Sequence, residues 1–194
     1  MNSSFLLRNI DLLSPLNHKI INSEADFILV SGESGTGKST LLKMIRKQNE
    51  STTRYFSSKN HIFSGSLSEN IWAGRSGGVN LSDVLQILFP NERYLQFPES
   101  TVSEKNISDG QIQRICIARD VICSGDKIVL LDEPTSALDP NTEGSVVKML
   151  VDFQKDFKVK KYVIATHSGR MGRLLSDSKS KLLELSLRGV RLRD

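Results

Sequence analysis

The chain has 194 residues, 38% of them hydrophobic, so it is long and apolar enough to bury a core and is expected to form one domain. Its net charge of +4 is spread over scattered positions, and no basic patch interleaved with aromatic residues accompanies it, which argues against direct nucleic-acid binding. The longest apolar runs have four residues, and a membrane-spanning helix needs about 20, so we expect no membrane span. The N-terminus lacks a basic region followed by an apolar stretch, so we also expect no secretory signal.

The two cysteines, Cys116 and Cys123, are expected on one helix. Seven helical residues put them about 10 Å apart, which is beyond the reach of a disulfide bond. We therefore expect both to be reduced core residues in a protein of the cytosol.

The first part of the chain is predicted to be rich in β-strand. Phe5–Leu7 and Ile20–Ile21 are short apolar segments between polar turns, so residues 1–31 are expected to form a small strand layer. This layer would lead into an apolar run at Phe27–Val30, which is typical of a buried strand. A helix is expected next, over residues 41–49.

The middle of the chain is predicted to be mainly helical. Residues 52–63 are expected to be extended, and residues 66–98 show helical periodicity interrupted by glycines. Within them, a helix over Ser82–Leu88 would be capped by Ser82 and would end before Pro90. A further helix is expected over residues 108–123, since apolar residues recur there at intervals of three and four.

The last third of the chain alternates strands and helices. Lys127–Leu131 and Tyr162–Ala165 have the continuous apolar character of buried parallel strands, and a helix is expected between them over Asn141–Phe157. Residues 181–190 alternate weakly and are expected to form a closing hairpin. Strands that alternate with helices predict a parallel sheet covered on both faces.

Residues 32–40 fit the pattern G-x-x-x-x-G-K-[ST] of a phosphate-binding loop. Glycines in such a loop let backbone N–H groups turn inward around an anion. Lys38 supplies a positive charge for the β- and γ-phosphates, and the Ser39 hydroxyl is a hard oxygen ligand for Mg²⁺. A predicted strand before the loop and a predicted helix after it complete an anion site. The predicted phosphate-binding residues are Gly32, Glu33, Ser34, Gly35, Thr36, Gly37, Lys38, Ser39 and Thr40.

Two acidic residues, Asp132 and Glu133, follow the apolar residues Leu130 and Leu131. A strand that ends in two acids places carboxylates at the carboxyl edge of the sheet, where open α/β sheets bind ligands. Asp132 is expected to hold Mg²⁺ through water, and Glu133 to orient or deprotonate an attacking water molecule. The plainer alternative is a solvated acidic turn after a core strand.

Four segments of the chain carry a family pattern, namely Gly32–Thr40, Ile107–Gln111, Leu131–Asp139 and Ala165–His167. They occur in the order and spacing of ABC-type ATPases, and the chain resembles the nucleotide-binding domain of an ABC transporter over nearly its whole length. Residues 107–119 resemble the LSGGQ signature and its continuation, which distinguish this class from other phosphate-loop proteins. Phe63–Ile71 resembles the FSGTIRENI stretch of exporter-type members, and Thr101–Glu104 faintly resembles their TxVGE segment.

The resemblance implies an α/β fold of the P-loop NTPase (ABC-type) class, with a RecA-like parallel-sheet core, a small antiparallel β subdomain and an inserted helical subdomain. The core would comprise residues 1–63 and 108–194, and the inserted helical lobe would comprise about 64–107. The resemblance also implies an ATPase that uses ATP and Mg²⁺ and couples hydrolysis to transmembrane transport.

The matched residues take their implied roles from the same resemblance. The metal ligands would be Ser39 and Asp132, and the catalytic residues would be Lys38, Glu133 and His167. His167 would contact the γ-phosphate as charge develops there. The signature residues would complete the nucleotide site of a second subunit, and Asp139 would couple the two sites. These signature residues are Ser108, Gly110 and Gln111.

Two nucleotides would thus be held head-to-tail between two ABC-type ATPase subunits, as a homodimer or a heterodimer. Because we expect no membrane span in this chain, the transmembrane transporter part would be a separate subunit or part of a longer polypeptide. That part would select the substrate. The protein would be cytoplasmic and peripheral on the cytoplasmic face of a membrane, and its exporter-like segments favour export over import.

Three positions depart from the family pattern. Ser58 stands where a glutamine is expected, and Asp109 replaces the first glycine of the signature. The adenine-stacking aromatic residue is either missing or replaced by Phe5. A carboxylate at position 109 should repel a partner's γ-phosphate by about 1 kcal/mol or more. Two other functions stay open: a soluble ABC-type ATPase in nucleic-acid repair or translation, and a nucleotide-responsive regulatory module with little hydrolysis.

Overall fold

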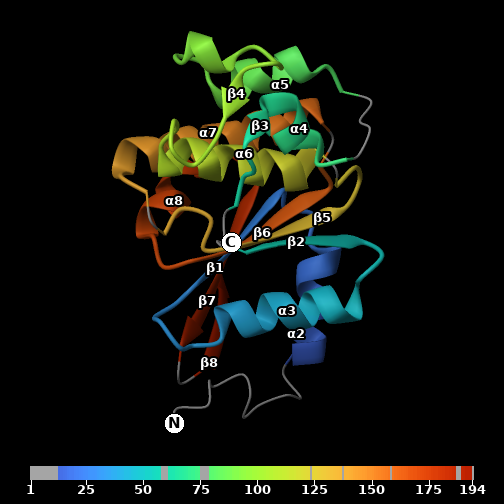
Figure 1. The fold of residues 1–194 in the computed structure, drawn as a ribbon. Helices are drawn as coiled ribbons and strands as arrows, with labels where there is room; N and C mark the ends of the chain where they lie inside the picture. The colour runs from blue at the N-terminus through green and yellow to red at the C-terminus, as the bar shows by residue number, and fades with distance from the viewer. Residues whose placement is uncertain are drawn as a thin grey trace.

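A six-stranded sheet forms the centre of the computed structural model (Figure 1), which describes residues 13–57, 61–74, 79–122, 124–136, 138–157, 159–186 and 189–193. Within these residues the strands follow the order β2 (Thr53–Ser57), β5 (Ile128–Asp132), β6 (Lys161–Thr166), β1 (Phe27–Ser31), β7 (Ser180–Ser186) and β8 (Gly189–Arg193). Neighbouring strands pair in parallel from β2 to β7, and β8 pairs with β7 in an antiparallel manner. The predicted parallel sheet and closing hairpin are therefore confirmed.

Helices cover both faces of this sheet (Figure 1). One face is covered by α2 (Leu13–Asn22) and α3 (Lys38–Gln48), and the other by α6 (Asp109–Ile122), α7 (Pro140–Asp156) and α8 (Gly169–Leu174). Helices α3, α6 and α7 correspond to the helices predicted for these parts of the sequence.

Alternate residues of each central strand enter different cores. In β5, Ile128 and Leu130 pack on the side of α2 and α3, whereas Val129 and Leu131 pack on the side of α6 and α7. Strands β1 and β6 divide their residues between the two cores in the same way. Because both faces are buried, these strands appear in the sequence as continuous apolar runs.

A small antiparallel sheet lies away from the main sheet, within residues 64–107. It consists of β3 (Gly65–Ser66) and β4 (Thr101–Val102), and between them the chain forms α4 (Leu67–Trp72), α5 (Leu81–Leu88) and the short 3₁₀ helix η2 (Arg93–Leu95). Helices α4 and α5 pack on α6, on its side away from the main sheet (Figure 1). The division of the chain into a core and an inserted lobe stays a prediction.

The strand layer predicted for the residues before β1 is wrong where the structure describes them. Ile20 and Ile21 lie in helix α2, and Ile20 and Leu16 are buried together against the sheet. These two residues are four positions apart, which places them on one face of a helix. Outside the main sheet, the described residues form a single pair of antiparallel strands, β3 and β4. Phe5–Leu7 lie outside the described residues.

The buried side chain of Lys161, on β6, ties α2 to the sheet. Its Nζ donates to the carbonyl oxygens of Ile20 at 2.9 Å, of Ile21 at 3.1 Å and of Ser23. Carbonyl groups in the last turn of a helix have no partner within the helix, so this ammonium group caps the C-terminus of α2. Burial lowers the pKa of Lys161 to about 8.

Helix α5 has a different cap from the one predicted. The Asn80 side chain accepts a hydrogen bond from the Ser82 N–H at 3.0 Å, so Asn80 is the N-cap and Ser82 lies in the first turn. Both residue types cap well, and the sequence alone does not distinguish two candidates two positions apart. The helix ends at Leu88, before Pro90, as predicted.

Candidate active site

The predicted phosphate loop connects β1 to α3 and is folded closely on itself. Gly37 has a φ of +102° immediately before the first residue of α3, a conformation that favours glycine. A Cβ on Gly32 would lie 2.3 Å from the Leu185 carbonyl oxygen, so no larger residue fits there. The Thr36 hydroxyl donates to the Glu33 carbonyl oxygen at 2.9 Å. Since the first N–H groups of α3 have no acceptor within the helix, loop and helix together are suited to an anion.

The residues of this loop differ in exposure. Exposed or half-buried residues are Gly32, Glu33, Ser34, Gly35, Ser39 and Thr40, and buried residues are Thr36, Gly37 and Lys38. The Lys38 Nζ donates to the carbonyl oxygens of Gly32 at 2.7 Å and Glu33 at 3.1 Å. It also lies 3.6 Å from Oε1 of Glu133. The loop thus contains a buried cation beside a carboxylate.

Ser39 and Asp132 meet although 93 positions separate them in the sequence. The Ser39 hydroxyl donates to Oδ1 of Asp132 at 2.9 Å. Ser39 belongs to the first turn of α3, and Asp132 is the last residue of β5 and is nearly buried. The predicted pair of magnesium ligands therefore lies together.

Tyr55, on β2, also contacts Asp132 and was not predicted from the sequence. Its hydroxyl donates to Oδ2 of Asp132 at 2.7 Å. Burial, together with the hydrogen bond to Asp132, raises the pKa of Tyr55 well above its usual value, so the phenol stays protonated and acts as the donor. No sequence signal points to this residue until the pairing of β2 with β5 is known.

Glu133 and His167 form the other side of the site. Oε2 of Glu133 lies 2.8 Å from Nδ1 of His167. Glu133 has a φ of +52°, which is uncommon for a residue with a side chain and recurs at functional sites. Its N–H donates to the Ala165 carbonyl oxygen at 3.0 Å, and its carbonyl oxygen accepts the Ser136 hydroxyl at 3.2 Å. The neighbouring strand and turn thus hold this backbone conformation.

The residues described so far have the chemical groups that a metal–triphosphate complex requires. Among the described residues, no group of three or more His, Cys, Asp or Glu side chains is placed to hold a metal ion by itself. Mg²⁺ usually takes one or two protein oxygens and completes its shell with phosphate oxygens and water. One hydroxyl and one carboxylate, from Ser39 and Asp132, fit that requirement beside a loop that is suited to phosphate.

The predicted signature residues lie at the N-terminus of α6. The Gln111 N–H donates to the Ser108 hydroxyl at 3.3 Å, and the Ser108 N–H donates to the Gln111 side-chain oxygen at 2.9 Å. This reciprocal pair is a capping box, with Ser108 as the residue that caps α6. The Gln111 side chain also donates to the Tyr94 hydroxyl at 3.1 Å. Ser108 and Asp109 are exposed.

Asp139 caps the N-terminus of α7 beside the signature. Its side chain accepts hydrogen bonds from the Asn141 N–H at 2.9 Å, from the Thr142 N–H at 3.2 Å and from the Thr142 hydroxyl at 2.5 Å. These hydrogen bonds, above all the one from the Thr142 hydroxyl, hold the pKa of this exposed carboxyl below its usual value. A Cβ on Gly110 would lie 2.7 Å from the Thr142 methyl group, so α6 and α7 approach closely here. Among the described residues, no hydrogen bond or ion pair joins Ser108, Gln111 or Asp139 to the phosphate loop.

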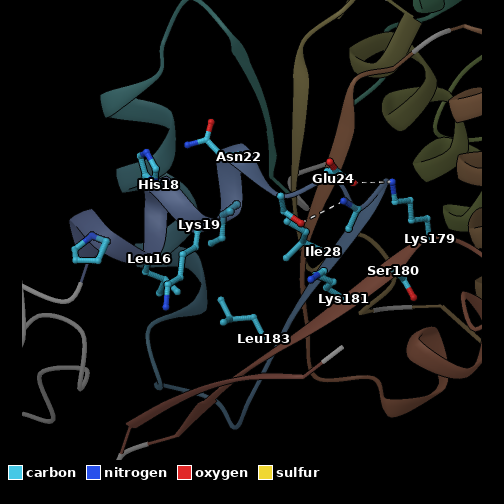
Figure 2. A pocket seen from close by; sticks show the side chains of 14 residues that line it. Leu16, His18, Lys19, Asn22, Glu24, Ile28, Lys179, Ser180, Lys181 and Leu183 are labelled. Carbon is cyan, nitrogen blue, oxygen red and sulfur yellow. Dashed lines mark hydrogen bonds and ion pairs between the residues drawn. The ribbon is translucent and has the colours of Figure 1, made fainter.

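A cavity of about 770 Å³ lies elsewhere, between α2 and the beginnings of β1 and β7 (Figure 2). Its apolar lining includes Leu16, Ile28 and Leu183, and the ion pair between Lys179 and Glu24 lies at its edge. No predicted site residue lines it. The phosphate loop follows the opposite end of β1, so this cavity is separate from the candidate site.

Some residues discussed above cannot be placed. Ser58, at the glutamine position, and Phe5 lie outside the described residues, as does Cys123. Cys116 is a buried free thiol, as predicted. Among the described residues, no helix combines the length and the apolar character that crossing a membrane requires.

Comparisons with known proteins show which family the chain resembles. The family profile described as ABC transporter matches residues 48–136. The phosphate import ATP-binding proteins PstB 1 of Streptococcus pyogenes serotypes M3 and M1 are each 30% identical to the chain, over 79% of its length and 73% of theirs. A solved structure of a metal-chelate type ABC transporter in an inward-facing conformation matches with a TM-score of 0.65 and 24% identity, over 89% of this chain and 73% of that one. This structural match bears on the fold alone.

Proposed function

We propose that the chain, which belongs to the family of ABC transporter ATP-binding proteins, powers the movement of a substrate across a membrane together with a transmembrane partner. Members of this family bind ATP with Mg²⁺ and hydrolyse it, and the chain is an ATPase of this kind. The observation that carries the proposal is the convergence of Lys38, Asp132, Glu133 and His167 from separate segments at the carboxyl ends of β1, β5 and β6.

Each of these side chains has a chemical task in hydrolysis. Mg²⁺, held by Ser39 and Asp132, would neutralise negative charge on the phosphates when it is bound. The Lys38 ammonium would bind phosphate oxygens in exchange for part of its present contacts with Glu133 and the loop carbonyls. Glu133 would accept the proton of the attacking water, a role that needs an ionised carboxylate within hydrogen-bond reach.

His167 would hold Glu133 and contact the terminal phosphate at the same time. Its Nδ1 contacts Glu133, which leaves Nε2 for a phosphate oxygen. Neutral imidazole has a single N–H, so donation to both groups requires the imidazolium form. The histidine would thereby connect the base to the phosphoryl group that the water molecule attacks.

The exposed residues at the start of α6 support a composite site. Ser108 caps α6 through its hydrogen bonds with Gln111, and in the part of the chain that the structure describes no hydrogen bond or ion pair joins it to the phosphate loop. We propose that Ser108, Gly110 and Gln111 complete the site of a facing ABC-type ATPase subunit, with Asp139 beside them. The simplest such subunit is a second copy of this chain.

The helices of residues 64–107 favour transport over action on nucleic acid. ABC-type ATPases of nucleic-acid repair or translation usually carry long coiled-coil insertions or tandem domains, and a coiled coil needs three or four heptads. Helices α4 and α5 have 6 and 8 residues. The named relatives are import proteins, while Phe63–Ile71 resembles exporters. Because the relatives match most of the chain and the exporter-like segments are short, we propose import.

Phosphate release by the purified chain tests this proposal. We expect release that requires Mg²⁺, stops in EDTA and changes when membranes carrying the transmembrane partner are added. A change of the basal rate on adding DNA or RNA instead would support the nucleic-acid alternative. Tight ATP binding with no release under any of these conditions would support a regulatory module.

A further inference from the structure

Tyr55 reaches the candidate magnesium site from a strand that carries none of the predicted site residues. Strand β2 pairs in parallel with β5, and Tyr55 is opposite Leu130. Residues two apart on a strand share a face, so Leu130 and Asp132 lie on the same face of β5 as Tyr55 on β2. The half-buried Tyr55 side chain runs along this face toward the end of β5, where its hydroxyl meets Asp132.

The two oxygens of Asp132 have different partners. Oδ1 accepts the Ser39 hydroxyl at 2.9 Å, and Oδ2 accepts the Tyr55 hydroxyl at 2.7 Å. A carboxylate held at both oxygens cannot rotate about its terminal bond without breaking one of these hydrogen bonds. Oδ1 therefore stays directed to Ser39.

We propose that Tyr55 is a positioning residue for the magnesium site and acts through Asp132. The inference rests on the proposed roles of Ser39 and Asp132. Groups that hydrogen-bond a metal ligand fix its orientation, and their removal typically lowers metal affinity by about 10–100-fold. A Tyr55 that only filled space between β2 and α3 would have no such effect on metal affinity.

The chain offers a matched control in Tyr162. This residue lies on β6, is fully buried and stacks on Phe27 with ring centroids 5.2 Å apart. Its hydroxyl has no hydrogen-bond partner among the described residues. Tyr162→Phe therefore removes a buried phenol oxygen from the same sheet without touching Asp132.

The experiment measures how much Mg²⁺ strengthens nucleotide binding. The affinity of the full chain for a non-hydrolysable ATP analogue is determined by calorimetry in Mg²⁺ and in EDTA, and the ratio of the two affinities is compared between variants. We expect Tyr55→Phe to lower this ratio about tenfold while leaving the affinity in EDTA unchanged. Tyr55→Met keeps an adaptable apolar side chain at this position without a hydroxyl and should give the same loss, and Tyr162→Phe should leave the ratio unchanged.

A double-mutant cycle tests whether Tyr55 acts through Asp132. In an Asp132→Asn background, the further change Tyr55→Phe should have little additional effect on the ratio. An unchanged ratio in Tyr55→Phe, or an equal loss of affinity with and without Mg²⁺, would overturn the inference. A wild-type chain whose affinity does not depend on Mg²⁺ would instead contradict the proposed magnesium site itself, so the two failures are distinguishable.

Discussion

The two sets of predicted site residues are built in different ways. In the phosphate-loop half (Lys38, Ser39, Asp132, Glu133 and His167), each side chain contacts another member of the set. In the signature half (Ser108, Gly110, Gln111 and Asp139), the hydrogen bonds of the side chains go mostly to the first turns of α6 and α7.

The phosphate-loop half is assembled within one chain, whereas no hydrogen bond or ion pair between described residues joins the signature half to the phosphate loop of its own chain. The phosphate-loop half needs the whole sheet, because its members come from α3, the end of β5 and the end of β6. The signature half depends on local caps, which form wherever their helices form. These caps stabilise their own helices, and the exposure of Ser108 and Asp139 leaves both residues accessible to a facing subunit.

In the phosphate-loop half, Glu133→Gln should reduce the rate of ATP hydrolysis more than any other change. Glutamine keeps the size of the side chain but cannot accept a proton as a carboxylate does, so phosphate release should fall by about 10²–10⁴-fold. ATP affinity measured by calorimetry should be retained. Glu50→Gln, on an exposed residue, serves as the control. Turnover at the wild-type rate in Glu133→Gln would contradict the assigned role.

Lys38→Ala should abolish most nucleotide binding. The buried ammonium is replaced by a methyl group, and charge-assisted hydrogen bonds of this kind are worth enough to weaken ATP binding by roughly 100-fold. Lys43→Ala removes an exposed ammonium from the same helix and should leave ATP affinity unchanged. Equal affinities of the two variants for ATP, measured by calorimetry, would show that Lys38 does not bind the phosphates.

Lys161 lies outside both halves and should affect stability alone. Its pKa is about 8 in the folded chain and about 10.4 in the unfolded chain, so the unfolded chain binds more protons between these values. The free energy of unfolding should therefore rise from about pH 8 to pH 10.4, by at most about 3 kcal/mol, and should not change through this group at lower pH. Urea unfolding at several pH values should show a smaller rise in Lys161→Met. An equal rise in both proteins would exclude Lys161 as its source.

Asp109→Gly should give the smallest effect and concerns the signature half. Removing a carboxylate that would face a partner's phosphate is worth about 1 kcal/mol, so the ATPase rate or the lifetime of the ATP-held dimer should rise several-fold. Asp109→Asn, which removes only the charge, should act in the same direction. No change in rate or lifetime in either variant would indicate that the carboxylate is directed to solvent.

The sequence contained enough information for the main sheet and for the phosphate-loop half. Continuous apolar runs predicted the buried strands, and the spacing of Lys38, Asp132 and His167 relative to these strands placed them at the carboxyl edge of the sheet. Both signals depend on local pattern, because a residue that follows a parallel strand must lie at that edge whatever the partners of the strand are.

Contacts that depend on strand pairing and register could not be predicted from the sequence. The hydrogen bond of Tyr55 to Asp132 joins residues 77 positions apart and requires both the β2–β5 pairing and its register. The helix α2 was missed because Ile20 and Ile21 are adjacent and apolar, and the burial of Leu16 with Ile20 appears only once the helix is docked on the sheet.

The association state of the Glu133→Gln chain tests the central claim most directly. Sedimentation of the purified variant should show a single chain in EDTA and a pair of chains with Mg²⁺ and ATP, because the slowed hydrolysis keeps nucleotide between the two halves. The same variant with Lys38→Ala added should remain a single chain under both conditions. An association state of Glu133→Gln that does not respond to Mg²⁺ and ATP would contradict a site shared between two copies of this chain.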